Sequence, residues 1–201
     1  MASRRGPAGD LQVVVGWLAL LWVIYIIQLA LWNLAGYSLV DTFGLWPRKL
    51  HGLIGILTAH FLHGSLAHIA ANSIGLLILG WASCGYSRAL TGAAVGYAML
   101  CAGFFTWCFG SWNHPSEVHV GASGVIFGLM GFLLANGLFR RDLFAIFLGL
   151  ATLVLFGSGL TAALPPTLTH APTLQVSWEM HLGGFVGGIL ASWQYRRAKK
   201  V

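Results

Sequence analysis

Four polar residues in otherwise apolar stretches have side chains that could carry out chemistry: His68, Asn72, Ser123 and His181. A serine beside a neutral imidazole forms the nucleophile and general base of acyl transfer. Histidine and asparagine can donate hydrogen bonds to the oxyanion that such a reaction develops. Taken alone, a serine in a membrane helix usually bonds to its own helix, and an asparagine usually joins two helices. A catalytic interpretation therefore requires the fold to bring these residues together.

The composition indicates that these residues lie in membrane helices. Of 201 residues, 57% are hydrophobic and 8% are charged, whereas a soluble domain has about 25% charged residues. The segment from Leu11 to Ala35 contains no charged residue, and a bilayer span needs about 20 apolar residues. This first block is longer than the core of a signal peptide, so we expect a retained anchor. The sequence predicts an all-α, polytopic membrane protein.

Six apolar blocks predict a bundle of six transmembrane helices. We expect this bundle to form one domain over residues 11–195, between an N-terminal tail (1–10) and a basic C-terminal tail (196–201). The predicted spans are Leu11–Ala35, Leu66–Ser83, Ala89–Phe109, Val120–Phe139, Leu143–Leu160 and Trp178–Tyr195.

The basic residues predict the orientation of the bundle, because lysine and arginine favour cytoplasmic segments. With the N-terminus inside, the outer loops contain only Arg48 and Lys49, and the other nine basic residues are cytoplasmic. We therefore expect both termini in the cytoplasm of a bacterial cell and the protein in its plasma membrane. The net charge of +6 follows from topology and does not indicate a nucleic-acid partner.

This topology places the four polar residues at one depth. The second, fourth and sixth spans run inward, and each carries its polar residues near its outer end. His68 and Asn72, spaced by four, share one helix face. Five other histidines, taken singly, are expected at the membrane interface; they are His51, His60, His114, His119 and His170.

Glycine pairs predict which two spans touch. Gly124 and Gly128 follow Ser123, and Gly184 and Gly188 follow His181. Small residues spaced by four let membrane helices pack backbone to backbone. Such packing would hold the Ser123 hydroxyl beside the His181 imidazole. Backbone N–H groups of the helix that begins near Ser123 would add oxyanion donors.

These residues match a family pattern. Gly121-Ala122-Ser123-Gly124 resembles the GxSG motif of the rhomboid intramembrane serine proteases. The segment from His63 through His68 to Asn72 resembles their HxxxxHxxxN element, and His181-Leu182-Gly183-Gly184 is similar to their sixth-span histidine motif.

The resemblance implies a Ser123–His181 dyad, with His68, Asn72 and the backbone at Gly121 and Ala122 around the oxyanion. It implies that His63 supports the first loop and that Phe127 packs against the dyad histidine. Pro47-Arg48 is similar to a pair often found in that loop. Two positions differ from many members: Met180 replaces a small residue, and Phe127 lacks the hydroxyl of a tyrosine.

The resemblance also implies partners and a reaction. The substrates would be transmembrane segments of other proteins in the lipid bilayer, cleaved near their outer ends, with the fifth span as the candidate gate. No cofactor, metal or nucleotide is expected, because the chain contains neither a phosphate-binding loop nor an H-E-x-x-H motif. The residue two after Ser123 is Val125, so the G-x-S-x-G elbow of soluble hydrolases is absent.

Three hypotheses remain open from the sequence. The first is the serine endopeptidase. The second is a catalytically inactive relative that binds membrane helices in quality control. The third is a small transporter that uses the polar residues as a pathway. A carboxylate-assisted triad is not expected, because Glu179, the nearest acid, lies about 200° around the helix from His181.

Overall fold

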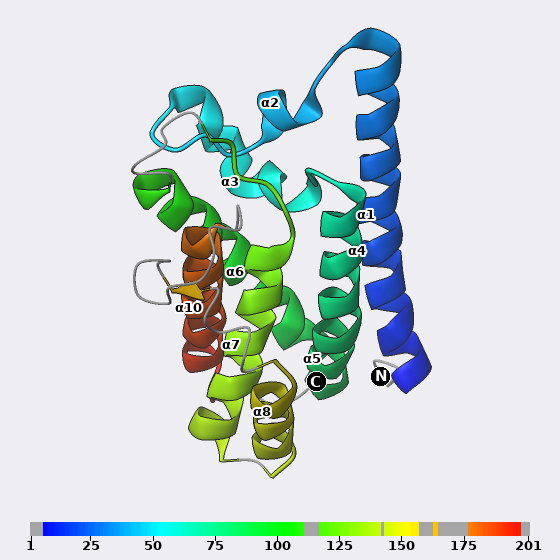
Figure 1. Cartoon of the computed structure of the whole chain (residues 1–201). Helices are drawn as coiled ribbons and strands as arrows, with labels where there is room; N and C mark the ends of the chain where they lie inside the picture. The colour runs from blue at the N-terminus through cyan, green and yellow to red at the C-terminus, as the bar shows by residue number, and fades with distance from the viewer. Residues whose placement is uncertain (1–5, 111–116, 142, 157–162, 165–176, 198–201) are drawn as a thin grey trace.

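The computed structural model describes residues 6–110, 117–141, 143–156, 163–164 and 177–197, and the regular elements in these ranges are helices (Figure 1). One isolated antiparallel bridge joins Leu45 to His119. The long helices are α1 (Pro7–Ala35), α4 (Leu66–Gly75), α6 (Arg88–Phe109), α7 (Ser123–Arg140), α8 (Leu143–Phe156) and α10 (Trp178–Gln194).

Four of the described helical stretches are long and apolar enough to cross a membrane: Pro7–Ala35, Leu66–Tyr86, Arg88–Phe109 and Ser123–Arg140. They match the first four predicted spans to within a few residues at each end. α10 has 17 residues and α8 has 14. The last residues of the predicted fifth span, 157–160, lie outside the described ranges.

The second span is not a single regular helix. A π-helical segment (η3, Leu76–Gly80) separates α4 from α5 (Trp81–Tyr86). Gly75 precedes this segment and Gly80 is its last residue, and side chains of neighbouring helices lie close to both. Ile126 of α7 lies 3.0 Å from the position that a Cβ atom on Gly75 would occupy, and Val14 of α1 lies 3.3 Å from the corresponding position on Gly80. The amphipathic pattern of this block gives no sign of a π-helical turn.

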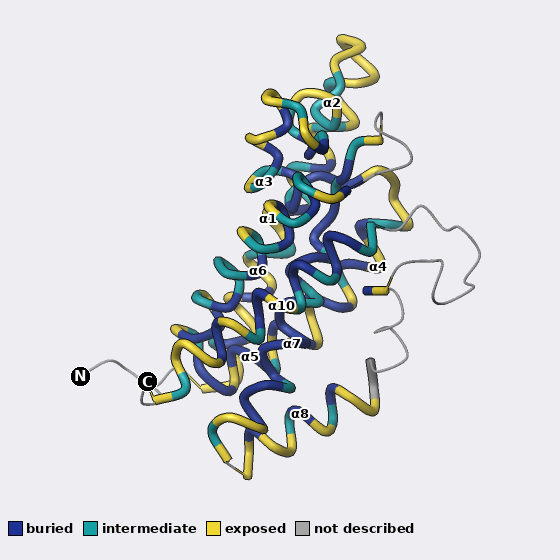
Figure 2. Tube along the Cα trace, turned by 90° about the vertical axis from the view of Figure 1, so that its left-hand side faces the viewer, coloured by how far each residue is buried: buried dark blue, intermediate teal, exposed yellow. Residues whose placement is uncertain are grey.

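α10 packs closely against two helices at once, and the buried residues in Figure 2 are dense around it. Side chains on Gly184 and Gly188 would overlap the carbonyl oxygens of Gly124 and Gly128 on α7. A Cβ on the adjacent Gly183 would lie 2.7 Å from the Cys101 carbonyl oxygen of α6. Backbone contact on both faces therefore fixes where the first turn of α10 lies.

By contrast, α1 is attached along one stripe. Its buried residues are Asp10, Val14, Leu21 and Tyr25, spaced by four, seven and four positions. This spacing follows one helix face. The Trp22 indole donates a hydrogen bond to the Ser73 hydroxyl on α4 (3.1 Å). The other faces of α1 expose large apolar side chains, as expected for a helix beside lipid.

The loop between α1 and α4 is folded into short helices: α2 (Leu39–Phe43), η1 (Leu50–Ile54), α3 (Gly55–Thr58) and η2 (Ala59–Phe61). Four aliphatic side chains of this loop are exposed, namely Leu50, Leu53, Ile54 and Leu57. Arg48 ties the loop to the end of α6, because its guanidinium donates to the Gly110 carbonyl (2.7 Å). The loop thus lies against the bundle with an apolar outer surface.

Candidate active site

The candidate nucleophile, Ser123, is the first residue of α7, and the segment before it is held by backbone hydrogen bonds. The His119 N–H donates to the Leu45 carbonyl (2.9 Å), and the Leu45 N–H donates to the His119 carbonyl (3.0 Å). The Gly121 N–H donates to the Ala59 carbonyl (2.9 Å). The loop between α1 and α4 therefore determines where the chain enters α7.

α7 begins differently from its neighbours. α4, α6 and α10 are capped by Ser65, Ser87 and Ser177, whose hydroxyls accept from the N–H three residues later at 3.1, 3.4 and 3.3 Å. At the start of α7, Ala122 occupies the cap position and offers no side-chain acceptor. The first N–H groups of a helix have no partner within the helix. The backbone N–H of Ser123 could therefore donate to a developing oxyanion.

The His181 ring lies against the face of α7 that carries Ser123. It stacks on Phe127 with centroids 4.1 Å apart and planes 7° from parallel. Phe127 is four residues after Ser123, so the two side chains share a helix face one turn apart. Met180 beside it is fully buried, and its Cγ lies 2.8 Å from where a Cβ on Gly124 would be. Ring stacking and glycine packing together hold the imidazole against α7 at Phe127, the residue one turn after Ser123.

Gly121 explains how two α4 side chains approach the start of α7. Its φ is +124°, and a Cβ there would lie 2.6 Å from His68 Nε2 and 3.4 Å from Asn72 Nδ2. A side chain would be strained in this conformation and would collide with the His68 ring. Asn72 is 6% exposed, and its buried amide nitrogen has no hydrogen-bond partner in the described part of the chain. Burying an amide donor without a hydrogen-bond partner destabilises the folded protein. The Asn72 amide beside Gly121 is therefore a candidate donor to a bound substrate.

His63 lies behind His68. Its ring is fully buried and meets the His68 ring edge-on, with centroids 5.1 Å apart. Gln28 of α1 donates to the His63 carbonyl (2.6 Å), which connects α1 to this cluster. Burial, with a smaller effect of His68, lowers the pKa of His63 to about 4. A neutral ring at this position supports the His68 ring without adding charge.

The interfacial interpretation is wrong for two further histidines. His60 and His119 are 2% and 8% exposed and lie inside the protein. His60 Nε2 lies 3.1 Å from the Met99 carbonyl oxygen of α6. Both flank the backbone contacts that hold Gly121, so they belong to the support of the site. His51 is exposed, whereas His114 and His170 lie outside the described residues.

Sequence reasoning also missed a polar cluster at the far end of α7 and α10. Asn136 Oδ1 accepts from the Ser192 hydroxyl (2.9 Å) and from Arg140 Nε (3.2 Å). Arg140 also donates to the Tyr195 carbonyl. The spacing of four residues between Asn136 and Arg140 could have predicted that their side chains meet on one helix face. The cluster joins the two helices at the end opposite Ser123.

Glu179 lies in the first turn of α10 and is buried, at 6% exposure. The Ser177 hydroxyl lies 3.5 Å from one of its carboxylate oxygens. A carboxylate in the first turn interacts favourably with the positive end of the helix dipole. We therefore interpret Glu179 as a residue that stabilises the first turn of α10.

Comparison with known proteins identifies related sequences over most of the chain. The family described as Rhomboid domain matches residues 50–198. An uncharacterized protein of Mycobacterium tuberculosis is 36% identical over 185 residues, covering 90% of this chain and 72% of that protein. An uncharacterized protein of Mycobacterium leprae is 34% identical, with coverages of 90% and 69%. RHOMBOID-like protein 1 of Arabidopsis thaliana is 28% identical over 145 residues, covering 70% of this chain and 34% of that protein.

Proposed function

Because the chain belongs to the rhomboid family, we propose that it is a six-span intramembrane serine endopeptidase acting on transmembrane segments of other membrane proteins. The observation that carries this proposal is the stack of His181 on Phe127, one helical turn from Ser123. Without that contact, the serine and the histidine would be two unrelated polar residues.

In the proposed reaction, the Ser123 hydroxyl attacks a peptide carbonyl as His181 accepts its proton. His181 then donates that proton to the leaving amine, and water hydrolyses the ester by the reverse sequence of transfers. The imidazole needs a fixed orientation to serve both steps. Stacking on Phe127 and the backbone contact of α10 with α7 supply it.

The proposed oxyanion site combines side-chain and backbone donors. Asn72 Nδ2 and His68 Nε2 lie close to Gly121, which is two residues before Ser123 at the uncapped start of α7. Donors fixed before reaction stabilise the developing charge, and each is typically worth a few kcal/mol. We propose that this site faces the outer surface, since most basic residues lie at the opposite end of the bundle.

The direct test is proteolysis of a single-span reporter by the purified protein, combined with labelling by a fluorophosphonate probe. We expect Ser123→Ala to abolish both cleavage and labelling, and His181→Ala to abolish cleavage. Ser83→Ala is the matched control, because Ser83 is a buried serine whose hydroxyl has no partner in the described chain. Cleavage by a folded Ser123→Ala protein at the wild-type rate would refute the proposal.

The transporter hypothesis requires a polar route through the bundle, and the packing argues against one. Between Ser123 and the Asn136 cluster, glycines of α7 lie against the α10 backbone. Side chains on Gly124, Gly128 and Gly131 would meet the Met180 side chain, the Ala98 side chain and the Phe185 carbonyl. Closely packed backbone leaves no space for a solute there. The inactive-relative hypothesis is separated from the protease by the labelling experiment.

A further inference from the structure

A groove of about 530 Å³ runs between α1 and α6, away from Ser123. Along α6 its lining residues include Arg88, Val95 and Met99, which recur on one helix face. Gly16 on α1 and Gly92 on α6 widen it, because a Cβ atom on either would meet no other atom within 4 Å. The two glycines leave this space open, although helix packing would accommodate a larger side chain at either position.

We propose that this groove binds one acyl chain of an anionic phospholipid whose phosphate contacts Arg88. The groove lies along two helices long enough to span a membrane, so it faces lipid tails. Its lining is almost entirely apolar, which suits an acyl chain. Arg88 is the first residue of α6 and lines the groove at that end of the helix.

The Asp10–Arg88 ion pair positions the guanidinium at the end of the groove. Arg88 Nε donates to an Asp10 carboxylate oxygen, and the arginine side chain remains 31% exposed. A guanidinium has five N–H donors in a planar fork, and arginine recognises phosphate through such a fork. Asp10 thus orients the group, and part of the arginine side chain stays accessible from outside the protein.

Charge at this end of the bundle favours an anionic lipid over a zwitterionic one. α6 begins at this end with Arg88, and α7 and α10 end there, next to Arg140, Arg141, Arg196 and Arg197. Within the described ranges, Asp10 on α1 is the one acid at that end. Arginines near a membrane surface attract anionic headgroups. Among the described residues, this end of the bundle therefore carries a net positive charge beyond the neutral Asp10–Arg88 pair.

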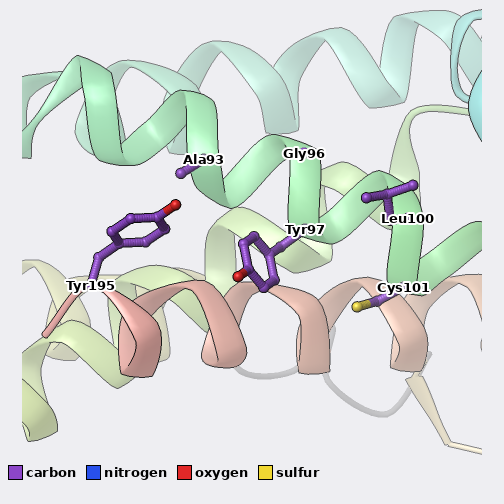
Figure 3. Close-up of a pocket in the computed structure, with 6 residues that line it drawn as sticks. All are labelled: Ala93, Gly96, Tyr97, Leu100, Cys101 and Tyr195. Atoms are coloured by element: carbon purple, nitrogen blue, oxygen red, sulfur yellow. The ribbon is translucent and has the colours of Figure 1, made fainter.

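A second groove on the opposite side of α6 provides the comparison. It has a volume of about 400 Å³ and is lined by Ala93, Gly96, Tyr97, Leu100, Cys101 and Tyr195 (Figure 3). None of these side chains is cationic. A lipid tail in this groove would have no fixed partner for its phosphate, so we expect no headgroup preference there.

The test measures lipid binding to the purified full-length protein in detergent by native mass spectrometry, using phosphatidylglycerol and phosphatidylcholine. We expect wild type to retain one phosphatidylglycerol in preference to phosphatidylcholine. Gly92→Leu fills the groove and should weaken that binding by at least about tenfold. Gly96→Leu, the matched change in the second groove, should leave it unchanged.

Two further variants test the groove from its α1 side and the role of the ion pair. Gly16→Leu fills the groove from α1 and should weaken binding as Gly92→Leu does. The double change Asp10→Asn with Arg88→Gln preserves a hydrogen-bonding pair and should remove the preference for phosphatidylglycerol. Thermal unfolding checks that each protein is folded. Equal retention of both lipids by wild type, or unchanged preference in folded Gly16→Leu and double variants, would overturn the proposal. None of these readouts depends on proteolysis.

Discussion

At the scale of single residues, the proposed oxyanion donors differ from the dyad in what their loss should cost. Asn72 Nδ2 and His68 Nε2 both approach Gly121, while the start of α7 offers backbone donors as well. Several donors share the developing charge, so removing one side chain leaves the others. Losing a single donor typically costs about 10²–10³ in rate, whereas losing the nucleophile or base removes the mechanism.

We therefore expect His68→Ala and Asn72→Ala to reduce kcat by up to about 10²–10³ and to leave measurable cleavage. Single-turnover cleavage of the reporter, beside Ser123→Ala, provides the measurement. His51→Ala, at an exposed histidine of the first loop, is the control. If both single variants and their combination cleave at the wild-type rate, the two side chains serve only to join helices.

Glu179 provides a second test at this scale, because it decides between a dyad and a triad. Two helix positions separate Glu179 from His181, which is a rotation of about 200°. The His181 ring instead has the Phe127 ring on one face. We expect Glu179→Gln to retain most of the wild-type kcat while His181→Ala retains none. A normally folded Glu179→Gln protein that is as inactive as His181→Ala would establish a carboxylate partner.

At the scale of elements, the contact between α7 and α10 is the feature on which the site depends. Gly184 and Gly188 bring the α10 backbone against the carbonyls of Gly124 and Gly128. Closely packed interiors accommodate added atoms only by shifting the backbone, because they contain few voids. A side chain at Gly184 must therefore move α10, and His181 one turn away must move with it.

We expect Gly184→Leu to lose reporter cleavage and to lower the Tm of the purified protein. Gly96→Leu is the matched control, since a Cβ atom on Gly96 would meet nothing within 4 Å. The control should keep both wild-type activity and Tm. Wild-type activity and Tm in Gly184→Leu would show that close packing of the two helices does not position the dyad.

The sequence predicted the helices better than their contacts. Apolar blocks bounded by serine, glycine and charged residues place the ends of α1 and α6 at Ala35 and Phe109, as observed. The glycine spacing predicted close packing of two spans, and the structure contains that contact. The π-helical turn at Leu76–Gly80 was not predictable, because nothing in its composition distinguishes it from an α-helical turn.

The residues missed by sequence reasoning are those whose burial depends on distant segments. His119 is buried against the loop that contains Leu45, and His60 reaches a carbonyl of α6. A local pattern contains no information on such contacts. The prediction that Ser123 and His181 lie close together used their common depth in the predicted topology and the spacing of the glycines after them, and both can be read from the sequence. The first loop had no such regularity.

At the scale of the whole molecule, buried histidines make folding depend on pH. Burial lowers the pKa of His60, His63 and His119 from 6.5 to about 4, and Arg48 contributes at His119. All three lie outside the candidate spans. The unfolded chain takes up protons on these rings as the pH falls through 6.5, whereas the folded protein does so only near pH 4. Between these values the unfolded state binds more protons, so acid favours unfolding.

The stability of the protein should therefore be highest above about pH 6.5 and fall as the pH approaches 4. We expect a lower Tm in detergent at about pH 5 than at about pH 7.5. His119→Gln should reduce this difference without removing it, because His60 and His63 still resist protonation in the folded state. His51→Gln, which changes an exposed histidine, should leave the difference unchanged. A Tm that does not vary with pH in wild type, or a larger difference in His119→Gln, would show that these rings are protonated without cost.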